Sequence, residues 1–411
     1  MKKHWIVICF VNFFIASLMG LLLRWMYVSP IEGVNFQFLM HGHSHVAMLG
    51  WVYMMLYCLI VYNFIPKEAQ QKRIYNRLFW ITEVAVIGMM LDFPAQGYAF
   101  VSILFSTLHI FCSYYFARLI WKDAKPTTFP EKRMLRTALL FMVFSTFGVW
   151  CLGPAVGLLG KSSAFYQICI QYFLHFQFNG WFLFAVLALF FKQIQLKIDE
   201  KKFRLFYSLF VIATIMTLAL PVSWFLTNPV FYWINVVGVV LQLVAAVLFI
   251  QNARSQLQVF FGTLSSLEKI VYGFALLSLI LKIGIQLIVL FPELAQMSHQ
   301  IRNFVIGYIH LTMLGIITGF LFGFALKNNF INVQNVIQKW GIQVFLTGFV
   351  ATEMLLFLQG LCLFFETGML PHYYLSLFVG SVLLAIGLLL ITGDLLSHVK
   401  RKQVTTQNNP I

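Results

Sequence analysis

The feature that most constrains this chain is a series of twelve continuous apolar runs, each about 20 residues long, the length at which a helix crosses the hydrocarbon core of a bilayer. The chain is 61% hydrophobic and 10% charged, whereas a typical soluble domain is about 25% charged. These values exclude a soluble globular domain, a disordered chain and a disulfide scaffold. Because the runs are continuous and not alternating, they also argue against a transmembrane β-barrel.

The pattern predicts an all-α polytopic membrane protein. A single transmembrane domain of about twelve helices occupies residues 1–402, and a polar tail follows at 403–411. The predicted spans are 5–27, 42–65, 78–97, 99–121, 135–158, 165–191, 203–225, 229–251, 268–291, 303–326, 340–365 and 373–397. All six cysteines lie in these runs without a CxxC motif, so attached c-type haem and a zinc ribbon are unsupported.

Lysine and arginine fall mostly on one side of the predicted spans. With a cytoplasmic N-terminus, nearly all of the loop Lys and Arg residues lie inside, and the outer side keeps only Arg24, Lys161 and Arg302. This bias predicts a multi-pass protein of the cell inner membrane with both termini cytoplasmic. The net charge of +15 therefore reflects topology. Membrane lipid is the expected partner, and nucleic acid is not.

An internal repeat carries three histidines. His45, His175 and His310 are 130 and 135 residues apart, on spans 2, 6 and 10. Each is followed five residues later by a glycine, namely Gly50, Gly180 and Gly315. A four-span period predicts three related four-helix units. These units cover about 1–130, 131–265 and 266–400.

The three histidines share one depth in the outer half of the bilayer, and His109 on span 4 lies at a similar depth. Imidazole is a common ligand of haem iron and copper, so a cofactor site is one interpretation. A hydrogen bond between neighbouring helices is the other. On a regular helix His41 and His45 share a face, whereas His43 points roughly opposite.

With these motifs the chain resembles subunit I of the haem-copper oxidase superfamily, in particular its nitric oxide reductase and cbb3-type branches. The resemblance implies three four-helix units around a pseudo-threefold axis. It also implies a low-spin haem b between one histidine of span 2 and one of span 10. Those positions match His45 and His310, with His43 as the alternative on span 2. His175 matches the family's first copper ligand.

Three departures from the family concern its binuclear centre. Tyr308 occupies the position of the high-spin haem ligand, span 7 lacks the paired histidines, and Asn179 stands where many oxidases have a tyrosine. The resemblance therefore implies a retained low-spin haem and a degenerate binuclear centre. It leaves copper binding and oxidoreductase activity open.

Charged residues within or beside the spans have two interpretations. Arg24 and Arg302 lie just outside the spans, where they could bind haem propionates or lipid headgroups. Glu83, Asp92, Lys282 and Glu353 lie in or at the edge of apolar runs. Such residues form either a proton or ion path or neutralised contacts between helices.

The resulting prediction is an integral membrane haem protein for respiratory electron transfer or diatomic-gas chemistry. Its expected partners are a cytochrome or quinol electron donor and small partner subunits. Two alternatives stay open. One is a haem- and copper-containing sensor or nitric oxide tolerance protein like the NnrS family. The other is a cofactor-free transporter or assembly factor on the same scaffold.

Overall fold

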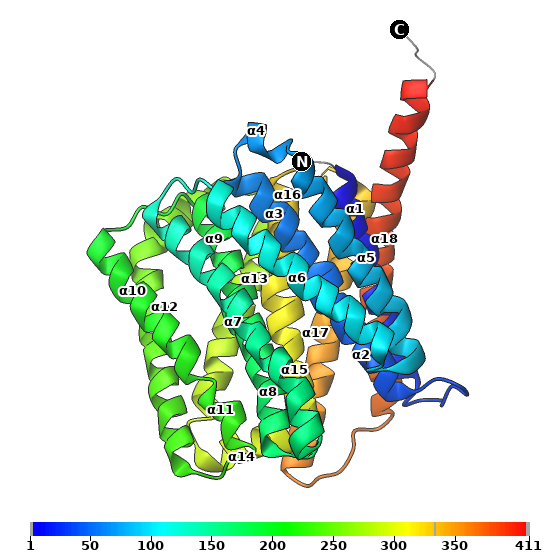
Figure 1. Cartoon of the computed structure of the whole chain (residues 1–411), viewed down its shortest axis with the longest axis vertical. Coiled ribbons are helices and arrows are strands. Elements are labelled where there is room, and N and C mark those ends of the chain that lie inside the picture. The colour runs from blue at the N-terminus through cyan, green and yellow to red at the C-terminus, as the bar shows by residue number, and fades with distance from the viewer. Residues whose placement is uncertain (1–2, 333, 408–411) are drawn as a thin grey trace. The chain divides into compact units, whose positions relative to one another are not determined.

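The computed structural model describes residues 3–332 and 334–407 (Figure 1). In this part of the chain, twelve helical segments are long and apolar enough to cross a membrane, which confirms the predicted number. The protein is an all-α polytopic membrane protein. Eight spans are single helices: α1 (Lys3–Trp25), α5 (Arg73–Gln96), α6 (Phe100–Asp123), α7 (Phe129–Leu159), α12 (Pro229–Gly262), α13 (Ser266–Ile288), α17 (Val336–Phe364) and α18 (Tyr373–Gln407).

The other four spans are composite. Span 7 consists of α10 (Glu200–Met216) and α11 (Ala219–Ser223). Spans 2, 6 and 10 each contain a central π-helical segment, labelled η. Their parts are α2 (Phe36–His45), η1 (Val46–Tyr53) and α3 (Met54–Phe64); α8 (Ala164–His175), η2 (Phe176–Phe182) and α9 (Leu183–Gln193); α15 (Arg302–His310), η3 (Leu311–Thr318) and α16 (Gly319–Lys327). Two short helices, α4 (Lys67–Gln70) and α14 (Pro292–Gln300), lie in the connections.

The predicted polar tail begins inside a helix. Helix α18 continues to Gln407, beyond the predicted end of its span at 397, and the last four residues of the tail lie outside the described residues. By its contacts the chain divides into two compact units. Unit 1 combines Met1–Phe116 with Leu321–Ile411, and unit 2 is Ala117–Phe320. The threefold repeat stays a prediction.

In unit 1, helix α1 packs against α18 and η1, α17 packs against α18, and α2 packs against α5. Helix α1 begins and α18 ends at the same end of the unit (Figure 1). The centre is aromatic: Trp51 stacks on Phe13 with ring centroids 4.4 Å apart, and Phe322 and Phe345 surround Phe13. Large rings fill this space because each buries much apolar area.

In unit 2, helix α7 packs against α8, η2 and α9, while α10 packs against α12 and η3 packs against α13. Polar caps start several of these helices. The Ser265 hydroxyl accepts a hydrogen bond from the Glu268 backbone N–H, and the Glu268 carboxylate accepts one from the Ser265 N–H. This capping box satisfies two N–H groups at the start of α13. Ser163 similarly caps α8.

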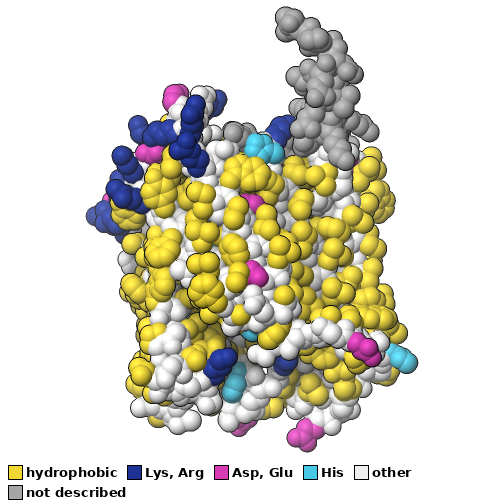
Figure 2. Space-filling view, turned by 45° about the vertical axis from the view of Figure 1, so that its right-hand side comes forward, with side chains coloured by type: hydrophobic (Ala, Val, Ile, Leu, Met, Phe, Trp, Pro, Cys, Tyr) yellow, Lys and Arg dark blue, Asp and Glu magenta, His cyan; other side chains and the backbone are white. Residues whose placement is uncertain are grey.

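Spans 2, 6 and 10 are the most buried of the twelve. In their apolar parts 78%, 83% and 83% of residues are buried, against 28% to 50% in the other nine. Hydrophobic side chains cover the middle of the face that Figure 2 shows, whereas most of the visible Lys and Arg side chains lie near its upper edge. The three spans that carry the repeat histidines are therefore inner helices.

Candidate functional site

Each repeat histidine immediately precedes a π-helical segment. His45 is followed by η1, His175 by η2 and His310 by η3. A π-helical turn holds one extra residue compared with an α-helix, is uncommon, and is frequent at functional sites. The same irregularity at three corresponding positions gives the sequence repeat a structural counterpart.

Two of the repeat glycines allow close packing at these segments. A Cβ added at Gly50 would lie 2.8 Å from Val86 Cγ1, and one at Gly180 would lie 2.7 Å from Phe141 Cβ. Both distances are shorter than side chains tolerate, so these two glycines face close neighbours. Gly315 is also buried.

Burial changes along each inner helix at its histidine. In α2 only Leu39 and Gly42 are buried, and in α15 no residue is. In α8 only Cys169 and His175 are buried. After the histidine nearly every residue of the η segment and the following α-helix is buried. Each histidine therefore stands where a more accessible half of the helix meets a tightly packed half.

His45 has the hydrogen-bond arrangement of a metal-ligating histidine. Its Nδ1 donates to the backbone carbonyl of His41 at 2.9 Å, and the described residues give Nε2 no hydrogen-bond partner. Its ring stacks on Phe93 at 4.1 Å between centroids. An Nδ1–H bond to a carbonyl fixes the tautomer in which Nε2 carries a free lone pair, as in most histidine ligands of metals.

His41 and His43 have other neighbours. The His43 Nδ1 lies 2.8 Å from the carbonyl oxygen of Ala16 on α1, and its ring fills the space beside Gly20. His43 therefore joins α1 to α2. The His41 ring lies against Tyr98, with ring centroids 4.7 Å apart.

His109 on α6 is a buried histidine of the same unit. It is 3% exposed, its Nε2 has no hydrogen-bond partner among the described residues, and its ring lies edge-on to Tyr53 at 4.6 Å between centroids. Unit 1 thus contains two imidazoles, those of His45 and His109, whose Nε2 atoms have no hydrogen-bond partner among the described residues.

His175 in unit 2 uses both ring nitrogens. Its Nε2 donates to the Thr214 carbonyl at 2.7 Å, and its Nδ1 accepts from the Asn179 amide at 3.3 Å. This arrangement ties η2 to α10 and satisfies a buried neutral imidazole. Metal binding by His175 stays a prediction that would require one of these bonds to break.

His310 and Tyr308 lie in α15, where both are half-buried. The Tyr308 carbonyl accepts a hydrogen bond from the Thr312 hydroxyl at 2.9 Å. Arg302 is the exposed first residue of the same helix, eight residues before His310. The roles of His310 and Arg302 toward haem stay predictions.

A buried carboxyl group in unit 1 has polar neighbours. The Asn12 amide donates to Glu83 Oε2 at 3.0 Å and to the Gly50 carbonyl of η1 at 3.1 Å. These contacts favour the interpretation of Glu83 as a neutralised contact between helices. Glu353 on α17 is half-buried, and its role stays a prediction.

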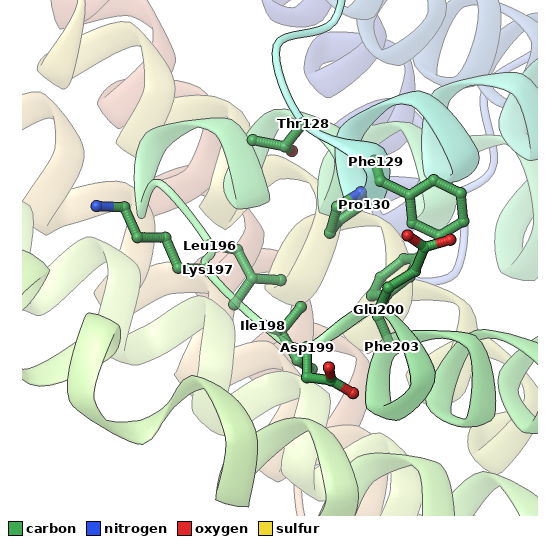
Figure 3. A pocket seen from close by; sticks show the side chains of 9 residues that line it. All are labelled: Thr128, Phe129, Pro130, Leu196, Lys197, Ile198, Asp199, Glu200 and Phe203. Atoms are coloured by element: carbon green, nitrogen blue, oxygen red, sulfur yellow. The ribbon is translucent and has the colours of Figure 1, made fainter.

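A pocket at the surface of unit 2 lies apart from the histidines. Its lining comes from the start of α7, from residues 196–199 and from the start of α10 (Figure 3). Asp199 accepts from two backbone N–H groups of α10, and Glu200 forms an ion pair with Arg204. Both carboxylates stabilise the helix start, and the lining includes no histidine.

Within residues 3–332 and 334–407, no three His, Cys, Asp or Glu side chains come close enough together to hold a metal ion. The chain matches no model of a known protein family and no curated protein sequence. Similarity to the haem-copper oxidases therefore rests on the sequence motifs.

Three polar residues were not anticipated as hydrogen-bond partners: Asn12, Gln242 and Gln286. Asn12 satisfies the carbonyl of a repeat glycine, and in unit 2 Gln286 accepts from both Gln242 and Lys282. The available signal was an isolated amide within an apolar run, which is costly to bury without a partner.

Proposed function

We propose that this protein is a membrane-embedded haem b protein in which His45 and His310 are the axial ligands. The observation that carries the proposal is the shared local structure at the three repeat histidines, each followed at once by a π-helical segment. This equivalence supports the sequence repeat on which the resemblance depends. The free Nε2 of His45 fits an axial ligand, because haem iron binds an imidazole nitrogen with an available lone pair.

When bound, haem b supplies one-electron redox chemistry and, with an open axial position, diatomic-gas binding. In this proposal the His41 carbonyl orients the His45 ring, and Phe93 excludes water from one face of it. Arg302 is the proposed partner of a propionate. Arg24 is the second candidate for this role.

The remaining predictions are retained as part of this proposal. Electrons come from a cytochrome or a quinol, small partner subunits assemble with the chain, and both termini are cytoplasmic in an inner membrane. Copper is left out, because His175 uses both of its ring nitrogens in hydrogen bonds.

The experiment is a reduced-minus-oxidised visible spectrum of detergent-purified protein expressed with ample haem. We expect a sharp low-spin haem b band, and His45→Ala and His310→Ala should each abolish it or convert it to a high-spin spectrum. His372→Asn is the matched control, because His372 is exposed and has a φ of 51°, which asparagine tolerates.

A wild-type protein without haem would contradict the proposal and favour a cofactor-free transporter or assembly factor. An unchanged low-spin spectrum in both alanine variants would show that other residues bind the haem. Carbon monoxide or nitric oxide binding to the reduced protein would favour gas chemistry over electron transfer alone.

A further inference from the structure

Lys282 is a buried cation in the membrane-spanning part of unit 2. It lies on α13 and is 1% exposed, and it is the only Lys or Arg in the described chain that is fully buried. A charged side chain at the centre of a bilayer is costly, and such residues usually have a partner.

Its protein neighbours satisfy it only in part. Nζ donates to Gln286 Oε1 at 3.2 Å and lies 5.6 Å from the centroid of the Tyr308 ring. The same Gln286 oxygen accepts from the Gln242 amide at 2.7 Å. An ammonium has three N–H donors, and the described residues provide one hydrogen-bond acceptor.

No neighbouring side chain supplies a negative charge. Among the described residues Lys282 has no ion pair with a carboxylate. The His175 ring also cannot accept from the ammonium, because its two nitrogens already bond Thr214 and Asn179.

Further amide groups lie on α12 and α13, between Lys282 and the end at which these two helices meet. The Tyr232 hydroxyl at the start of α12 donates to the Leu290 carbonyl just after α13, so these helix ends meet. Asn235 follows one turn later, 1% exposed, and its Nδ2 has no hydrogen-bond partner. Gln242 lies seven residues beyond Asn235 and therefore on the same face of α12.

We propose that Lys282, with the amides of Gln242 and Gln286, forms an intramembrane binding site for a small inorganic monovalent anion. The anion completes the hydrogen bonds of the ammonium and supplies its missing counter-charge. Asn235 provides a free N–H donor along the route by which an anion would pass from the ends of α12 and α13 to Lys282. This site lies within unit 2 and does not depend on the proposed haem function.

The test uses the purified full chain and follows its thermal unfolding with rising bromide, at constant ionic strength maintained with gluconate. We expect a saturable rise in Tm for the wild type. Lys282→Met removes the charge at similar length and should weaken bromide binding at least tenfold. Lys269→Met is the matched control, because Lys269 is exposed on the same helix, and it should respond like the wild type.

Size-exclusion chromatography first establishes that each variant is folded. Bromide anomalous diffraction provides an independent measurement, with a peak expected beside Lys282 Nζ in the wild type and none in Lys282→Met. A wild type without a saturable response, an equal response in Lys282→Met, or a wild-type crystal without that peak would each overturn the proposal.

Discussion

Asn12 shows how one side chain stabilises the irregular part of an inner helix. A π-helical turn disturbs the regular ladder of backbone bonds, and the Gly50 carbonyl in η1 accepts from the Asn12 amide. The same amide donates to Glu83, so α1, η1 and α5 meet at one group. Loss of the Asn12 amide should therefore weaken the contacts among α1, η1 and α5.

We predict that Asn12→Ala lowers the unfolding free energy by about 1–3 kcal/mol, because it leaves a buried carbonyl and a buried carboxyl group without their donor. Thermal unfolding in detergent measures the change. Thr347→Ala is the control, since the Thr347 hydroxyl is exposed and bonds only within its own helix. Equal stability of the two variants would contradict the prediction.

At the level of the site, sequence reasoning found the residues but not their environments. The repeat selected His45, and the structure gives it a fixed tautomer. The same repeat could not show that His175 is satisfied by Thr214, because that partner lies 39 residues away on another helix. Spacing reports position along a chain, whereas hydrogen-bond partners depend on tertiary packing.

Among the elements, the three spans with a π-helical segment differ most from the sequence expectation. Span number and approximate bounds follow from hydropathy, since each run must cover the same apolar thickness. The η segments do not, because their sequences are as apolar as ordinary α-helix. The glycine five residues after each repeat histidine is the only sequence feature that coincides with the position of the η segments.

The close approach at η2 gives a prediction for Gly180. Gly180→Ala should destabilise the protein by about 1–3 kcal/mol, because the added methyl meets Phe141 at 2.7 Å in a packed interior. Gly157→Ala on α7 provides the comparison. Its Cβ would have no neighbour within 4 Å, and alanine favours a helix over glycine by about 0.5–1 kcal/mol.

Chemical or thermal unfolding of both variants decides this prediction. A Gly180→Ala protein as stable as Gly157→Ala would mean that α7 and η2 separate readily. The close packing of η2 against α7 would then contribute nothing to the free energy of unfolding.

For the whole molecule, the sequence predicted twelve membrane-spanning helices from composition and length alone, and the described chain has them. The division into two contact units was not predicted, because it depends on which helices pack together. Unit 1 joins residues from both ends of the chain, a pairing that hydropathy does not encode.

The orientation of the molecule is testable with single cysteines in exposed loop residues. A membrane-impermeant maleimide should label Ser162→Cys in intact cells and Gln71→Cys only after permeabilisation, because Lys and Arg concentrate in the loops predicted to be inside. The unsubstituted protein is the control for its six native cysteines. The reverse labelling pattern would invert the topology and place the histidines in the inner leaflet.

The shortness of one connection has a consequence for biosynthesis. Only three residues separate α5 from α6, and Gly97 among them has a φ of 63° and lies against Phe38, where a Cβ would be 2.5 Å from that ring. Three residues reach at most about 10 Å, so the end of α5 and the start of α6 stay within that distance of each other. We therefore expect the machinery that inserts the nascent chain to receive α5 and α6 as one helical hairpin.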